Sequence, residues 1–367
     1  MLKTIFVFII IIHALIHFMG FAKAFGYGNI TQLTKYISKP TGILWFTAAG
    51  LFIVAVILFL LKKESWAYIA IVAAILSQIL IIIVWQDAKF GTILNAIILF
   101  VAIASLATHQ FEMMFEADVK RHISQTNFSN SDLLTEADIV TLPLPVQKYI
   151  RYSGAINKPK VKSIKIIFDG EMREKGKDFF SFKSVQYNFF DNPTRLFFMK
   201  ATMRGMPVSV YHCYQNERAT MQVKLLGLFY VVNVKGTEMN KAETVTVFND
   251  LCLIVPAALI DKRIEWTAID SLTAKATFTN GVNKISAILY FNTLGQLVNF
   301  ISDDRYVIGE MKQYRFSTPV KDYKLIDGRN IPSYAEAIWH YPDGEFVYGK
   351  FTLKSIEYNV TDFKNNL

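Results

Sequence analysis

The sequence predicts a four-helix transmembrane region followed by an α+β domain. In that domain a curved antiparallel β-sheet forms a half-barrel, and one long helix packs on its concave face. Three observations predict this fold class. Four long apolar runs lie within the first 110 residues. The rest of the chain contains about a dozen segments of alternating polarity, which is typical of half-buried strands. A single segment among them has the length and pattern of a long helix.

The transmembrane region is expected to cover residues 1–112. A helix needs roughly 20 mostly apolar residues to cross a bilayer. Four runs have about this length: 5–22, 42–61, 66–85 and 92–108. Short polar breaks separate the last three runs, which favours antiparallel neighbouring helices. The first run also has the lysine and apolar core of a cleaved signal peptide, but no small-x-small cleavage site follows it, so we expect a retained helix.

These runs predict an integral membrane protein whose first partner is the lipid bilayer. The orientation stays open, because one arrangement places five basic residues in the cytoplasm and the other places four. The net charge of +9 is spread over a mixed surface with no long Lys/Arg run. This pattern permits contact with anionic lipid and excludes the usual nucleic-acid-binding classes.

Residues 113–140 are expected to form an amphipathic connector, and residues 141–367 a β-rich domain. A short helix over 146–152, ended by Gly154, precedes the strands. The expected strands are 162–173, 179–190, 196–203, 208–214, 219–226, 229–234, 264–268, 272–279, 284–291, 297–302, 306–316, 320–326, 334–340 and 346–358.

The long helix is expected over 240–255, with acidic Glu238 near its start and Pro256 at its end. So many successive strands favour one large antiparallel sheet, which must curve or partly close to limit its edges. A helix embedded in such a series most simply packs on the concave face.

Several stretches resemble a known pattern. They are 142–150, 168–173, 185–187, 224–227, 255–259, 265–266 and 304–306. Together they resemble the soluble domain of a bacterial membrane-protein family of the DUF6544/DUF6920 type, over about residues 140–360. The resemblance leaves a catalytic role open and supplies no functional residues.

The order of strands and helix also looks like that of lipoprotein-carrier domains, in which a half-barrel sheet closes over a helix around an apolar cavity. That resemblance concerns architecture alone, and fold analogy is a weak basis for function. It implies a bacterial inner-membrane location with the β-rich domain outside the cytoplasm.

Three ionisable residues are candidates in the membrane region. His13 and His17 lie four residues apart and therefore share one face of a helix. We expect them to face the bundle interior and hydrogen-bond to neighbouring helices; metal or haem binding and a proton path are the alternatives. Asp87 lies in the break before the fourth run, where it is an interfacial anchor or, alternatively, part of a binding site.

Aromatic residues are the most telling feature of the strands, with 30 Phe and 17 Tyr in the chain. Adjacent pairs such as Phe197 and Phe198 place one ring on each face of a strand. The inward rings form either a thick core or the wall of an apolar cavity. The candidate cavity residues, chosen by period and aromaticity, are Phe180, Phe182, Tyr187, Phe189, Phe198, Tyr211 and Trp266.

The leading hypothesis is a membrane-anchored binding module that holds a lipid, a lipoprotein acyl chain or another apolar ligand at the membrane surface. An envelope assembly factor with a protein partner is one alternative, and an enzyme acting on envelope lipid or glycan is another. No phosphate loop, nucleophile elbow or metal-ligand cluster is present in the sequence, so we expect no catalytic residue, metal or cofactor. The pairing of Cys213 with Cys252 stays open.

Overall fold

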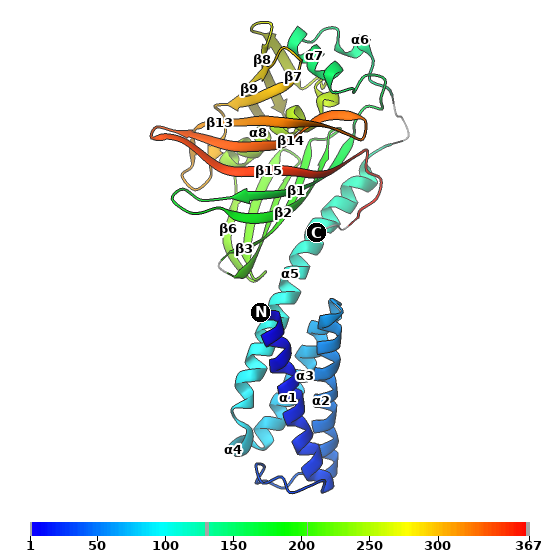
Figure 1. The fold of residues 1–367 in the computed structure, drawn as a ribbon, viewed down its shortest axis with the longest axis vertical. Coiled ribbons are helices and arrows are strands. Elements are labelled where there is room, and N and C mark those ends of the chain that lie inside the picture. The colour runs from blue at the N-terminus through cyan, green and yellow to red at the C-terminus, as the bar shows by residue number, and fades with distance from the viewer. Residues whose placement is uncertain (1, 129–131, 204, 365–367) are drawn as a thin grey trace. The chain divides into compact units, whose positions relative to one another are not determined.

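The computed structural model describes residues 2–128, 132–203 and 205–364 (Figure 1). The chain divides into two compact units. The first comprises Met1–Phe111 with the short segment Leu226–Leu228, and the second comprises Glu112–Leu225 with Phe229–Leu367. The first unit is helical and the second is dominated by strands.

Among the described residues, four helices are long and apolar enough to cross a membrane, and they coincide with the four predicted runs. They are α1 (Leu2–Phe25), α2 (Lys39–Leu60), α3 (Ser65–Ile83) and α5 (Gly91–Gln125); α4 (Trp85–Ala88) is a single turn before α5. Ser38 caps α2 by accepting a hydrogen bond from the Thr41 backbone N–H. Ala67, Ala70 and Ala73 are fully buried on one face of α3, where small side chains let neighbouring helices approach closely.

The helix α5 continues beyond the end of the predicted apolar run at residue 108. Phe111, Phe115 and Val119 explain this extension, because they repeat every four residues on one helix face and are almost fully buried. The helix therefore crosses the expected start of the connector at residue 113 and ends at Gln125. Residues 129–131 of that connector lie outside the described residues.

The second unit contains one large sheet, with 13 strands within the described residues. Its neighbouring strands all pair in antiparallel fashion. The strands are β1 (Ser163–Met172), β2 (Phe180–Phe189), β3 (Thr194–Met203), β4 (Met206–Gln215), β5 (Arg218–Leu225), β6 (Phe229–Lys235), β7 (Ile264–Ala268), β8 (Thr273–Asn280), β9 (Asn283–Phe291), β10 (Leu297–Ser302), β13 (Arg315–Ile326), β14 (Arg329–Tyr341) and β15 (Gly344–Tyr358).

The sheet consists of two meanders joined at one place. Its order is β6-β5-β4-β3-β2-β1-β15-β14-β13-β10-β9-β8-β7, so β6 and β7 are its two edges and it is not closed. The junction is the pairing of β1 with β15, in which Ile164 lies opposite Tyr358 and Ile166 opposite Ile356. In every other pairing, the two strands are consecutive along the chain among the strands of this sheet.

The predicted strand over 306–316 is wrong in its extent. Two short strands, β11 (Tyr306–Val307) and β12 (Lys312–Gln313), pair with each other as a separate hairpin, and β13 begins only at Arg315. The chain reverses because Met311 adopts a positive φ of 53°. That local turn conformation overrides the β-type composition of this stretch.

The predicted long helix is α8 (Thr237–Ile254), and it contacts β4, β5 and β6 as well as β9, β10 and β14. In a flat sheet β5 and β9 would lie on the order of 40 Å apart, at about 4.8 Å per strand. Contact of one helix with both therefore requires a curved sheet with α8 on its concave face, as predicted (Figure 1). Pro256 ends the helix and begins a 3₁₀ turn, Pro256–Ala258.

Two short helices complete the unit, α6 (Glu136–Ile139) and α7 (Leu144–Tyr152). α7 confirms the predicted short helix, and Gly154 follows it with a φ of 67°. The main core lies between α8, α7 and strands β7 to β10. At its centre Phe248 of α8 stacks on Phe278, with ring centroids 5.1 Å apart, and meets Phe300 edge-on.

We expect Phe248→Ala to destabilise the protein by about 3–5 kcal/mol, because it removes a fully buried ring from the helix–sheet core. Chemical denaturation of the full chain in detergent micelles, followed by near-ultraviolet circular dichroism, measures the loss. Val282→Ala is the control: this side chain is 90% exposed, so the change should stay within about 0.5 kcal/mol. Similar losses in both variants would contradict this description of the core.

Candidate functional site

A cavity of about 350 Å³ lies between α8 and the strands of the second unit. Its walls are mostly apolar. The strand residues face it at alternate positions, as in Phe197 and Met199 of β3 or Val208 and Val210 of β4. Four methionines contribute to the lining: Met172, Met199, Met203 and Met221. Because methionine is unbranched and polarisable, such a wall adapts to apolar ligands of different shape.

The helix α8 gives the cavity a polar side. Glu243, Thr246, Asn249 and Asp250 face the cavity at spacings of three, three and one residues, which places them on one helix face. The opposite face, with Phe248 among its residues, packs into the main core. The cavity is therefore amphipathic, with aliphatic and aromatic strands on one side and a polar helix face on the other.

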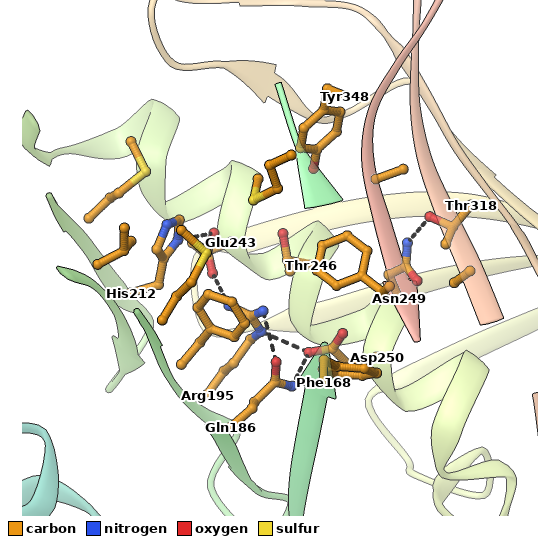
Figure 2. A pocket seen from close by; sticks show the side chains of 18 of the residues that line it. Phe168, Gln186, Arg195, His212, Glu243, Thr246, Asn249, Asp250, Thr318 and Tyr348 are labelled. Atoms are coloured by element: carbon orange, nitrogen blue, oxygen red, sulfur yellow. Dashed lines mark hydrogen bonds and ion pairs between the residues drawn. The ribbon is translucent and has the colours of Figure 1, made fainter. Parts of the chain in front are cut away.

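A buried cluster of charges lies where this helix face meets β2 and β3. Arg195 Nε donates to Asp250 Oδ2 at 2.7 Å, and its Nη1 donates to Glu243 Oε2 at 3.2 Å. Its Nη2 donates to Gln186 Oε1 at 2.9 Å (Figure 2). Asp250 Oδ2 also accepts from Gln186 Nε2 and from Asn188. Arg195 thus uses all three of its nitrogens within the protein.

His212 of β4 extends the cluster, with its Nδ1 3.1 Å from Glu243 Oε1. Burial alone would raise the pKa of Glu243, but His212 and Arg195 lower it from 4.5 to about 2. Glu243 is therefore ionised at neutral pH. A paired, ionised carboxylate positions its neighbours and does not donate a proton.

Of the seven predicted cavity residues, Phe180 is the one found in the lining of this cavity. Phe182, two residues along the same strand face, is not in the lining; it belongs to one apolar cluster with lining residues such as Phe197, and its ring meets Phe351 edge-on at 5.5 Å. Three others lie on the opposite face of the sheet. Tyr187, Phe198 and Tyr211 pack around Phe115, which belongs to the second-unit part of α5.

Phe189 lies beside His122 of the same helix, with ring centroids 5.3 Å apart. Trp266 packs at the margin of the main core and donates from its indole nitrogen to the Leu259 carbonyl oxygen at 3.2 Å. The second-unit part of α5 therefore occupies the face on which several of the predicted rings lie. Ligand binding by the seven predicted residues stays a prediction.

The two histidines of α1, His13 and His17, form hydrogen bonds inside the first unit. His17 Nδ1 donates to the His13 carbonyl oxygen at 2.7 Å, and its Nε2 lies 2.8 Å from the Ser77 hydroxyl. His13 Nε2 lies 2.8 Å from Asn95 Oδ1. Both rings are almost fully buried. The expected interior hydrogen bonds are thus present, while a metal or proton-path role stays a prediction.

Asp87 fixes a loop of the same unit. Its carboxylate accepts from the Thr34 backbone N–H at 2.7 Å and from the Thr34 hydroxyl at 2.9 Å. This geometry ties the segment between α1 and α2 to the turn α4. The roles of interfacial anchor and of binding-site residue both stay predictions for Asp87.

A serine, a histidine and a glutamate form a row across β13, β14 and β15. Ser317 Oγ lies 2.8 Å from His340 Nε2, and His340 Nδ1 lies 3.3 Å from Glu345 Oε1. A hydrolase triad has the same order of groups. However, Ser317 is only 2% exposed, and the described cavity lining contains none of the three. We assign the row to cross-strand hydrogen bonding.

Cys213 and Cys252 form no disulfide. Burial raises the pKa of the Cys213 thiol to about 11. Burial also raises the pKa of Cys252. Both thiols are therefore protonated and inert at neutral pH. In the part of the chain that the structure describes, no group of three or more His, Cys, Asp or Glu side chains could hold a metal ion.

The charged cluster is not among the sites predicted from the sequence. Two signals of it are present there: Gln186 and Asn188 lie in phase on one strand face, and Glu243 and Asp250 lie seven residues apart on one helix face. Arg195 had no such local pattern, because its partners come from other elements. Only the fold brings the guanidinium to both carboxylates.

We expect Arg195→Met to lower the stability at pH 7 by about 3–5 kcal/mol, because it leaves buried carboxylates unpaired. In the native protein the pKa of Glu243 is depressed, so its stabilising contribution is complete above about pH 4.5 and is lost as the pH falls toward 2. In the variant, burial should raise this pKa, so acidification from pH 7 to about 5 should restore stability.

Denaturation midpoints across this pH range measure both effects. Arg315→Met is the matched control, because Arg315 and its partner Asp303 are 57% and 67% exposed and the pair should contribute less than about 1 kcal/mol. A uniform loss at every pH would contradict the unpaired-carboxylate argument.

Comparison with solved structures finds similar folds at low identity. A LolA superfamily protein from Nitrosomonas europaea has 9% identity and a TM-score of 0.32, with 58% of this chain and 91% of that chain covered. A candidate outer membrane lipoprotein-sorting domain from Vibrio parahaemolyticus has 7% identity and a TM-score of 0.30, with 54% and 85% covered. At these values the similarities carry no argument about a ligand.

Comparison with curated proteins gives no match. The sequence pattern of DUF6544, a family of unknown function, matches residues 132–351. This match includes α6, ends within β15 and contains all the residues that line the cavity except Leu353. Because it covers more than half of the chain, and as the sequence resemblance predicts, the protein belongs to the DUF6544 family.

Proposed function

We propose that the protein is a membrane-anchored binding module that holds a lipid or another apolar ligand in the cavity beside α8. One observation carries this proposal: a cavity of about 350 Å³ with largely apolar walls lies inside a domain that is covalently joined to four helices long and apolar enough to cross a membrane. Pockets for small ligands fall in this size range and combine apolar walls with a few polar groups.

The character of the walls supports an acyl-type ligand. Burying a hydrocarbon chain contributes about 0.8 kcal/mol per CH₂ group removed from water. Methionines from β1, β3 and β5 face the cavity beside Phe197 and Val210. Such side chains tolerate chains that differ in length or unsaturation.

The anchor supports the same function. A domain joined to transmembrane helices stays at a high effective concentration beside the bilayer from which lipid would come. The proposal includes a bacterial inner-membrane location with the β-rich domain outside the cytoplasm, where lipid or lipoprotein ligands and envelope partners are accessible.

A role in protein assembly is the second candidate, and the edge strand β6 favours it. Phe229, Tyr230 and Val231 are each more than half exposed on this edge. An exposed apolar edge strand can pair with a strand of another protein. The cavity weighs toward ligand binding, because a protein that acts only through its edge needs no hollow interior.

An enzymatic function is supported less well than ligand binding. Glu243, Asp250 and His212 do gather in the cavity, as an acid–base site would require. Both carboxylates, however, pair with Arg195. Glu243 also remains ionised at neutral pH, with a pKa of about 2, so it cannot act as a general acid there.

Photo-crosslinking tests the proposal. The full chain is placed in nanodiscs that contain a diazirine-bearing phospholipid and is then irradiated. Peptide mass spectrometry locates the residues that carry lipid adducts. We expect adducts on cavity residues such as Met199 and Met221. Val223→Trp should reduce these adducts to background, because Val223 lines the cavity and an indole there occupies the ligand's space.

Gln222→Trp is the matched control, since the neighbouring residue on β5 points to the other face. It should leave the cavity adducts unchanged. If the native protein carries adducts only on the membrane-spanning helices, the binding-module proposal fails and the assembly role gains support.

A further inference from the structure

We propose that the ligand is an anionic amphiphile whose acidic head group, a phosphate or a carboxylate, binds Arg305 and Arg173 at the cavity wall. The inference rests on the proposed function and extends it from apolar ligands in general to one chemical class. It follows from the way in which the charged residues of the lining are paired.

Arg305 lies on an aromatic surface. Its guanidinium carbon is 4.0 Å from the centroid of the Phe316 ring and 5.1 Å from that of Trp339. Its Nη1 donates to the Tyr348 hydroxyl at 2.7 Å. A guanidinium has five N–H donors, so rings that cover its face leave most of its edge available. Within the described residues, Arg305 forms no ion pair.

Arg173, which directly follows β1, contacts the same part of β15 as Arg305 does. Its Nε donates to the Val347 carbonyl oxygen at 2.8 Å, and its backbone N–H donates to the Tyr348 carbonyl oxygen at 2.9 Å. Its guanidinium stacks on Phe179 and Phe346, at 4.4 and 5.0 Å. As far as the described residues show, it too has no carboxylate partner. Both arginines are half-buried and line the cavity.

The carboxylates of the cavity do not satisfy these two cations. Glu243 and Asp250 both bind Arg195, at 3.2 and 2.7 Å. The field of Arg305 reaches Glu243 and helps to lower its pKa, but no direct contact joins them. Glu174 also lines the cavity, yet it is exposed, where water screens its charge.

An acidic head group completes this arrangement. Two half-buried guanidinium groups, bonded to successive residues of β15, leave N–H donors beside an apolar space. Phosphate and carboxylate oxygens accept such donors in pairs, and these charge-assisted hydrogen bonds are among the strong ones. The attached hydrocarbon then contacts the methionine and phenylalanine walls. An uncharged amphiphile would contact the apolar walls but leave Arg305 and Arg173 without an anionic partner.

The test compares two probes of equal chain length in the full chain in nanodiscs: hexadecyl phosphate and hexadecanol, each carrying a diazirine near the end of the chain. Adducts on cavity residues are measured as each unlabelled compound competes. We expect the phosphate to compete about 10- to 100-fold more strongly than the alcohol, since a charge-assisted hydrogen bond contributes about 1.5–3 kcal/mol. Inorganic phosphate alone should not compete, because it lacks the hydrocarbon chain.

Arg305→Gln, combined with Arg173→Gln, should abolish the preference for the phosphate and leave the alcohol adducts unchanged. Retained alcohol adducts show that the variant is folded, and Arg305→Lys should recover part of the preference. Arg315→Gln removes an exposed, paired arginine and is the matched control. Equal competition by the two compounds, or an unchanged preference in the double variant, overturns the inference. Absence of cavity adducts from both probes instead overturns the proposed function.

Discussion

The concave face of the open sheet must be covered, and the rest of the second unit follows from this constraint. Thirteen antiparallel strands in the described chain place a long series of apolar side chains on one side. The curve brings strands from both meanders around one helix of 18 residues, which is about 27 Å long at 1.5 Å per residue. One helix of that size does not fill the whole concave space. Phe248 packs it against Phe278 and Phe300, and the space lined by β1–β6 and β13–β15 remains as the cavity.

The position of α8 inside the curve is fixed by polar contacts as well as by packing. Arg195 ties the helix to β3 through Glu243 and Asp250, and Asn249 donates to Thr318 of β13 at 2.6 Å. Buried ion pairs contribute little net stability, because desolvation offsets the attraction. Their effect here is to set the rotation of the helix. With that rotation fixed, the polar face is held toward the cavity and the phenylalanine face toward the core.

Local patterns predicted the elements well and their assembly less well. The boundaries of β7 and β10 follow from alternation and turn residues, and the four apolar helices follow from the length and hydropathy of their runs. The choice of cavity rings could not be made this way. Phe197 lines the cavity, whereas Phe198, on the other face of the strand, stacks on Phe115 of α5. Only the position of Phe115 decides which face of the sheet α5 covers. The pairing of Arg195 across three elements has no local pattern at all.

The β1–β15 junction determines when folding can finish. The two meanders are built from hairpins whose strands are close in sequence, so each can form soon after its residues are synthesised. The junction pairs Ile164 with Tyr358, across almost the whole domain, and closing so long a loop is slow. Until the last strand leaves the ribosome, β1 is a temporary third edge with unpaired backbone groups. For that interval the nascent domain needs protection from intermolecular pairing, although the mature domain has no edge at this place.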